Sequence, residues 1–138
     1  QACTQAGIAP DTLDHHYMEY GDEHYHDIPD MLLAHINQGK PQFDSVVCGN
    51  DRIAFMVYQT LLSQGLRIPD DVAVLGYDNM VGIGDLFLPP LSTVQLPHYE
   101  IGRLSALHII NGECHKNTVA VESPLLLRES VKNHSKSR

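Results

Sequence analysis

The chain has no apolar run long enough to cross a membrane. Apolar segments such as Val72 to Leu75 and Pro124 to Leu127 fall far short of the roughly 18 consecutive apolar residues that a membrane helix needs. The first residues, Gln1 to Gly7, contain neither an initiator Met nor the basic and apolar segments of a signal peptide. We expect no membrane span and no secretion signal, and we interpret Gln1 to Gly7 as the end of a helix within a longer protein.

The sequence also lacks a cluster of positive charge. Nine Lys and Arg face 17 Asp and Glu, which gives a net charge of −8 and a pI near 5.4. The cations are scattered, apart from a short group at Lys132, Lys136 and Arg138. A nucleic-acid surface needs clustered cations that displace the counterions of the phosphates. We therefore predict no nucleic-acid surface on this chain, and we interpret the basic group as a solvated end.

Cysteine is sparse, with Cys3, Cys48 and Cys114 far apart in the sequence. This spacing excludes a Cys-x-x-Cys metal or redox pair. Cys48 lies in an apolar segment, where a thiol usually behaves as a small hydrophobic group. The pattern favours a reducing compartment, the cytoplasm.

Sequence patterns of common catalytic sites are absent as well. The chain contains no Gly-x-Ser-x-Gly elbow, no phosphate-binding loop ending in Lys-Ser or Lys-Thr, and no His-Glu-x-x-His pair. Asp70 and Asp71 are adjacent carboxylates, but they precede a predicted strand and would lie opposite a ligand crevice. We predict that the protein is not an enzyme and has no catalytic residue or cofactor.

Histidine is abundant, with nine residues that include the pairs His15-His16 and His24-x-His26. Adjacent side chains on a strand point to opposite faces and cannot share an ion. No cysteine lies near either pair to complete a zinc site. We interpret these histidines as surface residues and predict no metal site.

The residues that are present predict an ordinary α/β protein, with 43% apolar and 19% charged residues. Strand-like and helix-like segments alternate, which favours a mainly parallel sheet flanked by helices. The expected strands are 15–20, 43–48, 72–75 and 119–122. The expected helices are 27–37, ended by Gly39, then one from Asn50 or Asp51 to Gly65, and 97–111. Between them, 77–91 is expected to be a long loop with one helical turn near 84–87.

Two polar pairs follow predicted strands, Asn50-Asp51 and Tyr77-Asp78. In an open parallel sheet the ligand binds beyond the carboxyl ends of the strands. An amide that donates and accepts, beside carboxylates that accept, suits a ligand with hydroxyl or amine groups. For Asn50 and Asp78 we favour contact with a ligand, whereas for Asp51 we favour a role as a helix cap.

The loop from Ile83 to Leu88 carries Leu86, Phe87 and Leu88 among glycines and prolines. Three large apolar side chains in such a loop are difficult to bury in one small lobe. The loop is compatible both with a place in the core and with a contact between subunits.

In their order and spacing, four blocks resemble the effector-binding domain of the LacI/GalR family of bacterial transcription regulators. The matching blocks are Phe43 to Asp51 (FDSVVCGND), Gly65 to Asn79 (GLRIPDDVAVLGYDN), Pro89 to Val94 (PPLSTV) and Leu127 to Val131 (LRESV). The resemblance implies a type I periplasmic-binding-protein-like fold of two lobes. Residues 1–131 would form an incomplete C-terminal lobe, with 97–118 crossing into the N-terminal lobe and 132–138 a disordered tail.

The resemblance also implies roles for individual residues. Asn50 and Asp78 would bond the effector, Asp51 would mainly cap a helix beside them, and Tyr25 would stack on the ligand. The interface of a homodimer would include three apolar side chains. These are Phe55, Leu86 and Phe87.

The resemblance implies an allosteric function. A sugar, nucleoside or similar effector would bind the closed arrangement of the lobes better than the open one, and thereby control operator DNA through an N-terminal helix-turn-helix that this chain lacks. The alternative is a lobe of a solute-binding protein for sugar transport or chemotaxis. An enzyme that uses the same cleft is a third alternative, for which no nucleophile or base pair is present.

Overall fold

The computed structural model of the chain describes residues 2–9, 12–14, 16, 25–80, 82–112 and 118–132. Its main sheet has the order β3 (Ser45–Val47), β4 (Ala73–Asp78), β5 (Ser92–Gln95), β6 (Leu125–Leu126). The first three strands are parallel and β6 runs antiparallel to β5. The predicted α/β class with a mainly parallel sheet is confirmed. Of the predicted strand 15–20 only His16 is described, and the tail beyond Lys132 also lies outside the described residues.

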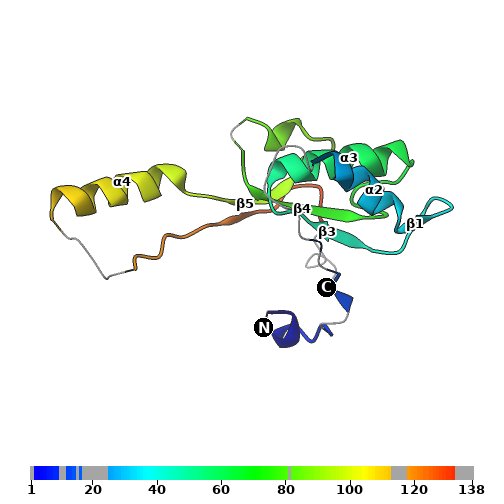
Figure 1. Cartoon of the computed structure of the whole chain (residues 1–138), viewed down its shortest axis with the longest axis horizontal. Coiled ribbons are helices and arrows are strands. Elements are labelled where there is room, and N and C mark those ends of the chain that lie inside the picture. The colour runs from blue at the N-terminus through cyan, green and yellow to red at the C-terminus, as the bar shows by residue number, and fades with distance from the viewer. Residues whose placement is uncertain are drawn as a thin grey trace.

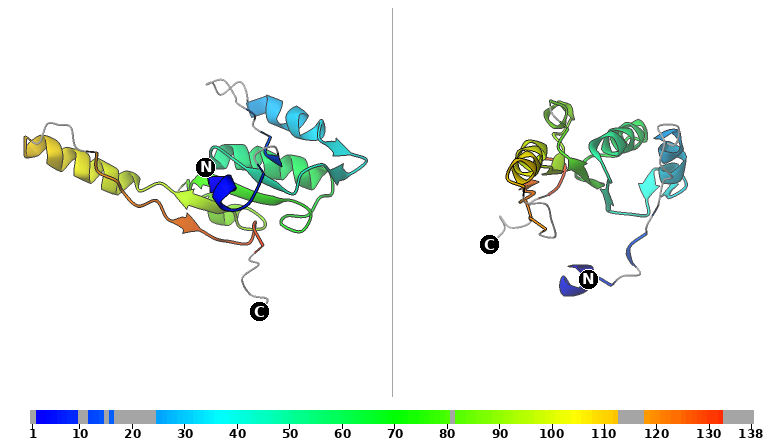
Figure 2. Two further views of the ribbon diagram at one scale, coloured as in Figure 1. Left: turned by 90° about the horizontal axis from the view of Figure 1, so that it is seen from below. Right: turned by 60° about the vertical axis from the view of Figure 1, so that its left-hand side comes forward.

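Helices α2 (Asp27–Leu33) and α3 (Asp51–Ser63) pack together beside the sheet, as Figure 1 and Figure 2 show. Helix α3 is amphipathic, and its inward face carries Ala54, Val57, Tyr58 and Leu61, all at most 3% exposed. This face packs against sheet residues such as Val74 and forms the core. The helix starts with Asn50 as N-cap, and Gly65, at φ +73°, follows its end as predicted.

Helix α4 (His98–Ile110) begins after Pro97 and ends before Gly112, as the sequence predicts. It extends away from the sheet, and residues 118–124 return beside it toward β6 (Figures 1 and 2). None of its residues is buried, and Tyr99, Ile109 and Ile110 are 77–84% exposed. No helix among the described residues is long and apolar enough to cross a membrane.

The prediction of a helix over 27–37 is wrong at its C-terminal end. Helix α2 stops at Leu33, and β1 (Ile36–Asn37) pairs antiparallel with β2 (Lys40–Pro41). The two residues between the strands, Gln38 and Gly39, have φ of +50° and +74°. Left-handed backbone at both central positions makes a tight hairpin turn, so Gly39 belongs to a turn and does not end the helix.

Two strand predictions also need correction. Strand β4 continues through Asp78, because it pairs with β5 as far as Asp78 opposite Gln95. Residues 119–122 form no strand; the pairing segment is Leu125–Leu126, opposite Thr93 and Val94. In both cases the partner strand decides where pairing ends, and the strand preference of the local residues does not predict that point. The remaining elements are α1 (Ala2–Gln5), with Gly7 at φ +73° after it, and the predicted turn in the long loop, η3 (Gly84–Leu86).

Candidate functional site

The two polar pairs lie at the same edge of the sheet. Strands β3 and β4 are in register with Val47 opposite Leu75, and the Cys48 N–H donates to the Leu75 carbonyl at 2.8 Å. Asn50 and Asp78 each come three residues after this pair. Both therefore stand at the carboxyl ends of parallel strands, where ligands of open α/β sheets bind.

Asn50 joins helix α3 to Tyr25. Its Oδ1 accepts a hydrogen bond from the Ile53 N–H at 2.9 Å, which caps the helix, and its Nδ2 donates to the Tyr25 hydroxyl at 3.3 Å. The structure brings together Asn50 and Tyr25, two of the predicted site residues that are 25 positions apart in the chain. The prediction that Asp51 is chiefly the cap is wrong, because Asn50 occupies the N-cap position.

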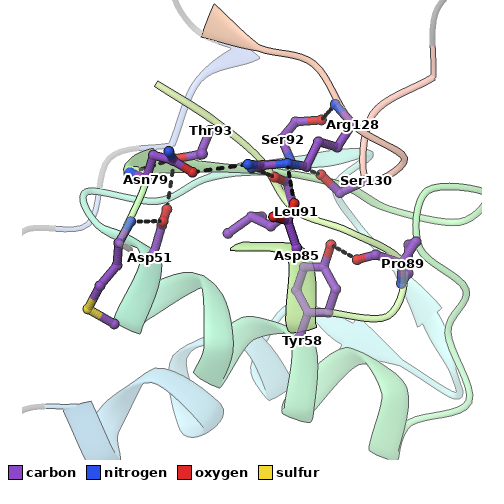
Figure 3. A network of polar contacts seen from close by, with 11 residues as sticks. Asp51, Tyr58, Asn79, Asp85, Pro89, Leu91, Ser92, Thr93, Arg128 and Ser130 are labelled. Atoms are coloured by element: carbon purple, nitrogen blue, oxygen red, sulfur yellow. Dashed lines mark hydrogen bonds and ion pairs between the residues drawn. The ribbon is translucent and has the colours of Figure 1, made fainter. Parts of the chain in front are cut away.

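Asp51 instead lies in the interior, with no exposed surface. Its Oδ1 accepts from the Thr93 hydroxyl at 2.8 Å and its Oδ2 from the Met80 N–H at 2.9 Å (Figure 3). A buried carboxylate is costly unless its oxygens are bonded, and these two bonds satisfy it. Asp51 thereby ties α3 to β5 and to the residues that follow β4. Nothing in the local sequence pattern marks Thr93 as its partner, since the two residues are 42 positions apart.

Asp78 ends β4 in an unusual conformation. Its φ is +99° and that of Asn79 is +49°, left-handed values that cost energy for residues other than glycine. The Asp78 Oδ1 is buried and has no hydrogen-bond partner among the residues that the structure describes. Burial raises the pKa of Asp78, and the neighbouring Asp51 carboxylate raises it further, while the Met80 N–H and His98 act in the opposite direction. An unpartnered buried acceptor on a strained corner is the feature that a ligand hydroxyl would satisfy.

Arg128 holds the start, middle and end of the loop that follows β4 (Figure 3). Its Nη2 donates to Asn79 Oδ1 at 3.1 Å, its Nη1 to the Leu91 carbonyl at 2.6 Å, and its Nε lies 3.0 Å from Asp85 Oδ1. Its backbone N–H donates to the Ser92 hydroxyl at 2.8 Å. No pattern in the sequence predicts this role for the arginine.

A second set of hydrogen bonds holds Ser130 and the loop residue Pro89 against the core. The Ser130 hydroxyl, fully buried, donates to the Val74 carbonyl at 2.6 Å and accepts from the Ser92 N–H at 2.7 Å. The Tyr58 hydroxyl donates to the Pro89 carbonyl at 3.0 Å, and burial raises the pKa of Tyr58 to about 12. Residues 128–130 therefore belong to the folded lobe.

A hollow of about 1180 Å³ opens along the outer edge of β3 and does not include Asp78. Asn50 and Tyr25 stand on its lining, which mixes apolar side chains such as Ile28 and Phe43 with polar ones such as His35. The strand ends, where Asp78 lies, stay the predicted ligand site, with Asn50 and Tyr25 at the boundary between the two regions.

Among the described residues, one group has the side chains for a metal ion: Asp14, His16 and His35, whose ligand atoms lie within 4.8 Å of one another. His35 is far from the other two in the sequence, so the neighbouring histidine pairs gave no sign of it. The His16 Nε2 is 3.1 Å from Asp14 Oδ2, and the two side chains are 46% and 70% exposed. The hydrogen bond itself accounts for their proximity, and we assign no ion to them. Of the histidines paired in the sequence analysis, His15 and His24 lie outside the described residues.

Buried Cys48 packs in the core beneath the site, 3% exposed. Burial, and next the charge of Asp51, raise the pKa of Cys48 to about 12. The thiol is therefore protonated at neutral pH and behaves as the small hydrophobic group that the sequence predicted.

The three residues expected at a dimer interface differ in exposure. Phe55 is 50% and Leu86 is 76% exposed, as is Leu88 at 79%. Phe87 is only 5% exposed, because its ring packs edge-on against Phe55 and Tyr58, with centroids 6.0 and 4.8 Å away. Phe87 therefore has little surface to offer a partner, and it supports the exposed residues from beneath.

Comparison with known proteins gives matches over most of the chain. A family model described as periplasmic binding proteins and sugar binding domain of the LacI family matches residues 1–129. The sucrose operon repressors of Escherichia coli and Shigella flexneri are both 52% identical over 131 residues. The match covers 95% of this chain and 40% of each repressor, so the chain spans less than half the length of these relatives.

Solved structures agree with the fold. A LacI family transcriptional regulator from Enterococcus faecium with bound ribose superposes with a TM-score of 0.74 at 26% identity, covering 94% of this chain and 47% of that one. A regulator from Arthrobacter sp. FB24 in complex with lactose gives a TM-score of 0.64 at 29% identity, covering 78% of this chain and 40% of that one.

Proposed function

Because the chain belongs to the family of periplasmic binding proteins and LacI-type sugar-binding domains, we propose that it forms one wall of the effector cleft of a sugar-responsive transcriptional repressor. The observation that carries the proposal is the buried, unpartnered Asp78 Oδ1 at the carboxyl end of β4. Asp78 accepts from a sugar hydroxyl, Asn50 donates through its Nδ2, and Tyr25 lies against the sugar ring. Asp51 holds these groups in place from beneath.

Sucrose, or one of its two constituent hexoses, is the effector that we favour. The relatives at 52% identity are sucrose operon repressors, and structures of the same fold contain ribose and lactose. Sugars present many hydroxyls that both donate and accept, which matches an amide beside carboxylates. Both relatives are repressors, which supports a sensing role without turnover.

The second wall of the cleft belongs to an N-terminal lobe. Helix α4 has no buried residue, and Tyr99, Ile109 and Ile110 on it are at least 77% exposed. Apolar exposure on this scale indicates a surface that another part of the protein covers. We therefore propose that the segment 97–118 belongs to that lobe and the rest of 1–131 to the C-terminal lobe.

Sugar binding in the cleft controls DNA allosterically in the whole protein. A sugar that contacts both walls favours their closed arrangement, and the closed arrangement changes how a dimer presents its N-terminal helix-turn-helix domains to the operator. Such a repressor works in the cytoplasm. The alternative, a solute-binding protein for transport or chemotaxis, shares the fold, but both relatives at 52% identity are repressors.

Replacing Asn50 with Ser is expected to weaken sugar binding, while the cost in stability is only that of the 3.3 Å hydrogen bond from Nδ2 to the Tyr25 hydroxyl. Serine is as good an N-cap as asparagine, so its hydroxyl still accepts from the Ile53 N–H. The Nδ2 donor is lost, and a hydrogen bond of this kind contributes about 0.5–1.5 kcal/mol, or roughly a 2- to 10-fold change in dissociation constant. Calorimetric titration of the intact protein with sucrose, fructose, glucose, ribose and lactose measures it.

The control for this prediction is Asn50→Ala, which removes the cap as well and costs about 1 kcal/mol of stability. If no sugar in the series binds the wild-type protein, the proposed function fails. If a sugar binds wild type and Asn50→Ser equally well, Asn50 has no contact with it.

A charge at position 86 is expected to prevent dimer formation. We propose that Phe55, Leu86 and Leu88, all at least 50% exposed, lie in the dimer interface with Phe87 beneath them. An unpaired carboxylate in a desolvated interface costs several kcal/mol, so Leu86→Glu shifts the dimer dissociation constant upward by about 100-fold or more. Sedimentation velocity over a concentration series measures the shift. The matched control is Leu125→Glu, an exposed leucine (51%) in β6; equal behaviour of the two variants contradicts the assignment.

A further inference from the structure

The guanidinium of Arg128 contacts both the backbone corner at Asp78–Asn79 and the η3 turn, Gly84–Leu86. Arg128 donates from Nη2 to Asn79 at the corner, and its Nε is paired with Asp85 in η3 (Figure 3). The Arg128 side chain is 19% exposed, whereas Asp85 is 79% exposed. A planar guanidinium holds several partners in fixed directions at once, so the two partners keep one mutual arrangement.

The loop is built to admit this side chain. Gly84 begins η3, and a Cβ at this position would lie 2.9 Å from Arg128 Nη1 and 3.4 Å from Asn79 Oδ1. Any larger residue would displace the guanidinium from the turn. The third contact, from Nη1 to the Leu91 carbonyl, places the end of the loop in the same cluster.

The corner needs support from outside because its backbone is strained. Asp78 and Asn79 both have left-handed φ, a conformation that persists only where surrounding contacts determine it. Asp51 holds the next residue through the Met80 N–H, and the Asn79 N–H lies 3.4 Å from the Thr93 hydroxyl. Of these supports, Arg128 is the one that also reaches η3.

We propose that Arg128 is a positioning residue that couples the Asp78–Asn79 corner to the Gly84–Leu86 turn, so that occupation of the sugar site alters the loop at the dimer surface. This inference rests on the proposed function for the identity of the two surfaces. Arg128 itself contacts no sugar; it fixes the corner that does and the turn that faces the partner.

The coupling is testable without a ligand by hydrogen–deuterium exchange. The variant Asp85→Ala cuts the guanidinium from the turn and leaves the corner residues unchanged. We expect exchange of the Met80 amide to rise by about five-fold or more, because the corner opens more often once its support loosens. Arg128→Lys, which cannot bridge the three partners, should raise it further. The matched control Asp70→Ala removes another surface ion pair, between Asp70 and Lys132, and should leave Met80 exchange at the wild-type rate.

An effect of Asp85→Ala confined to residues 84–86, with Met80 exchange unchanged, would overturn the proposal. Two further measurements on the intact protein distinguish coupling from a purely structural role of the ion pair. They are the affinity for sugar and the release of operator DNA on sugar binding. We expect Asp85→Ala to keep the sugar dissociation constant within about two-fold while the response of operator affinity shrinks by about five-fold or more. Parallel losses of stability, affinity and response would indicate a structural role and refute the coupling. Absence of sugar binding by the wild type refutes the proposed function, and the exchange experiment still decides the role of Arg128.

Discussion

Replacing Asp78 with Asn is expected to weaken sugar binding by about 5- to 10-fold while making the chain more stable. A hydrogen bond to a charged group contributes about 1.5–3 kcal/mol and one to a neutral group about 0.5–1.5 kcal/mol, and asparagine keeps only a neutral acceptor in place of the buried, unpartnered Oδ1 that the sugar would use. In the absence of sugar the same carboxylate is unfavourable, because it is desolvated and lies beside Asp51. Asparagine is neutral and tolerates a positive φ such as the +99° at this position, so stability should rise by about 0.5–1 kcal/mol.

The dependence on pH gives this prediction a second readout. The folded-state pKa of Asp78 is raised by burial and by Asp51, so its ionised form opposes folding. The stability contributed by its protonation therefore grows as the pH falls through the raised folded pKa, and is complete below the unfolded pKa. Sugar affinity moves the other way, because protonation removes the charged acceptor. Sugar affinity should start to fall at a pH where an ordinary Asp, with a pKa of about 3.9, is still ionised.

Calorimetric titration at a series of pH values, together with thermal unfolding, checks both parts. In Asp78→Asn, the parts of the pH dependence of stability and of sugar affinity that come from this carboxyl should vanish. An Asp78→Asn protein that binds the sugar as tightly as wild type would remove Asp78 from the site. One that is less stable than wild type would show that the Asp78 carboxylate has a partner in the folded protein.

Replacing Gly76 with Ala is expected to lower the free energy of unfolding by about 3 kcal/mol, as forced overpacking of a core typically does. A Cβ at Gly76 would overlap Asp51 Oδ1 and would lie 2.9 Å from Leu91 Cδ2 and 3.2 Å from Thr93 Oγ1. These atoms cannot retreat easily, because Asp51 is fully buried and bonded to Thr93 and Met80. The substitution should therefore also disturb the Asp78 corner and reduce sugar affinity.

Urea unfolding of Gly76→Ala measures the loss, and Gly49→Ala is the matched control. A Cβ at Gly49 would meet only Ile53 Cδ1, at an ordinary 3.8 Å, so its effect should stay within about 0.5 kcal/mol. The double variant Gly76→Ala with Asp51→Ala should lose less free energy of unfolding than the sum of the two single variants, because the carboxylate that the new Cβ would overlap is absent. Strict additivity, or an unaffected Gly76→Ala, would contradict the close packing of Asp51 under β4.

Much of the fold was predictable from local chemistry. The amphipathic spacing and glycine stop of α3, the continuous apolar segment of β4, the Pro97 start of α4 and the helical turn at Gly84 all appear where the residues predicted them. These features depend on residues that are neighbours in the chain. The ends of β4 and β6 were predicted incorrectly, because strand pairing between distant segments decided them, and the end of α2 was missed because a tight hairpin, β1 with β2, follows it.

The candidate site divides in the same way. The sequence by itself determined that polar residues follow two parallel strands, which was enough to single out Asn50 and Asp78. Only the tertiary structure decided that Asp51 is buried against Thr93, which leaves the cap to Asn50, and that Arg128 reaches Asn79 and Asp85. The physical reason is that a buried polar group must find its partner in three dimensions, and here those partners lie 42 and 49 residues away along the chain.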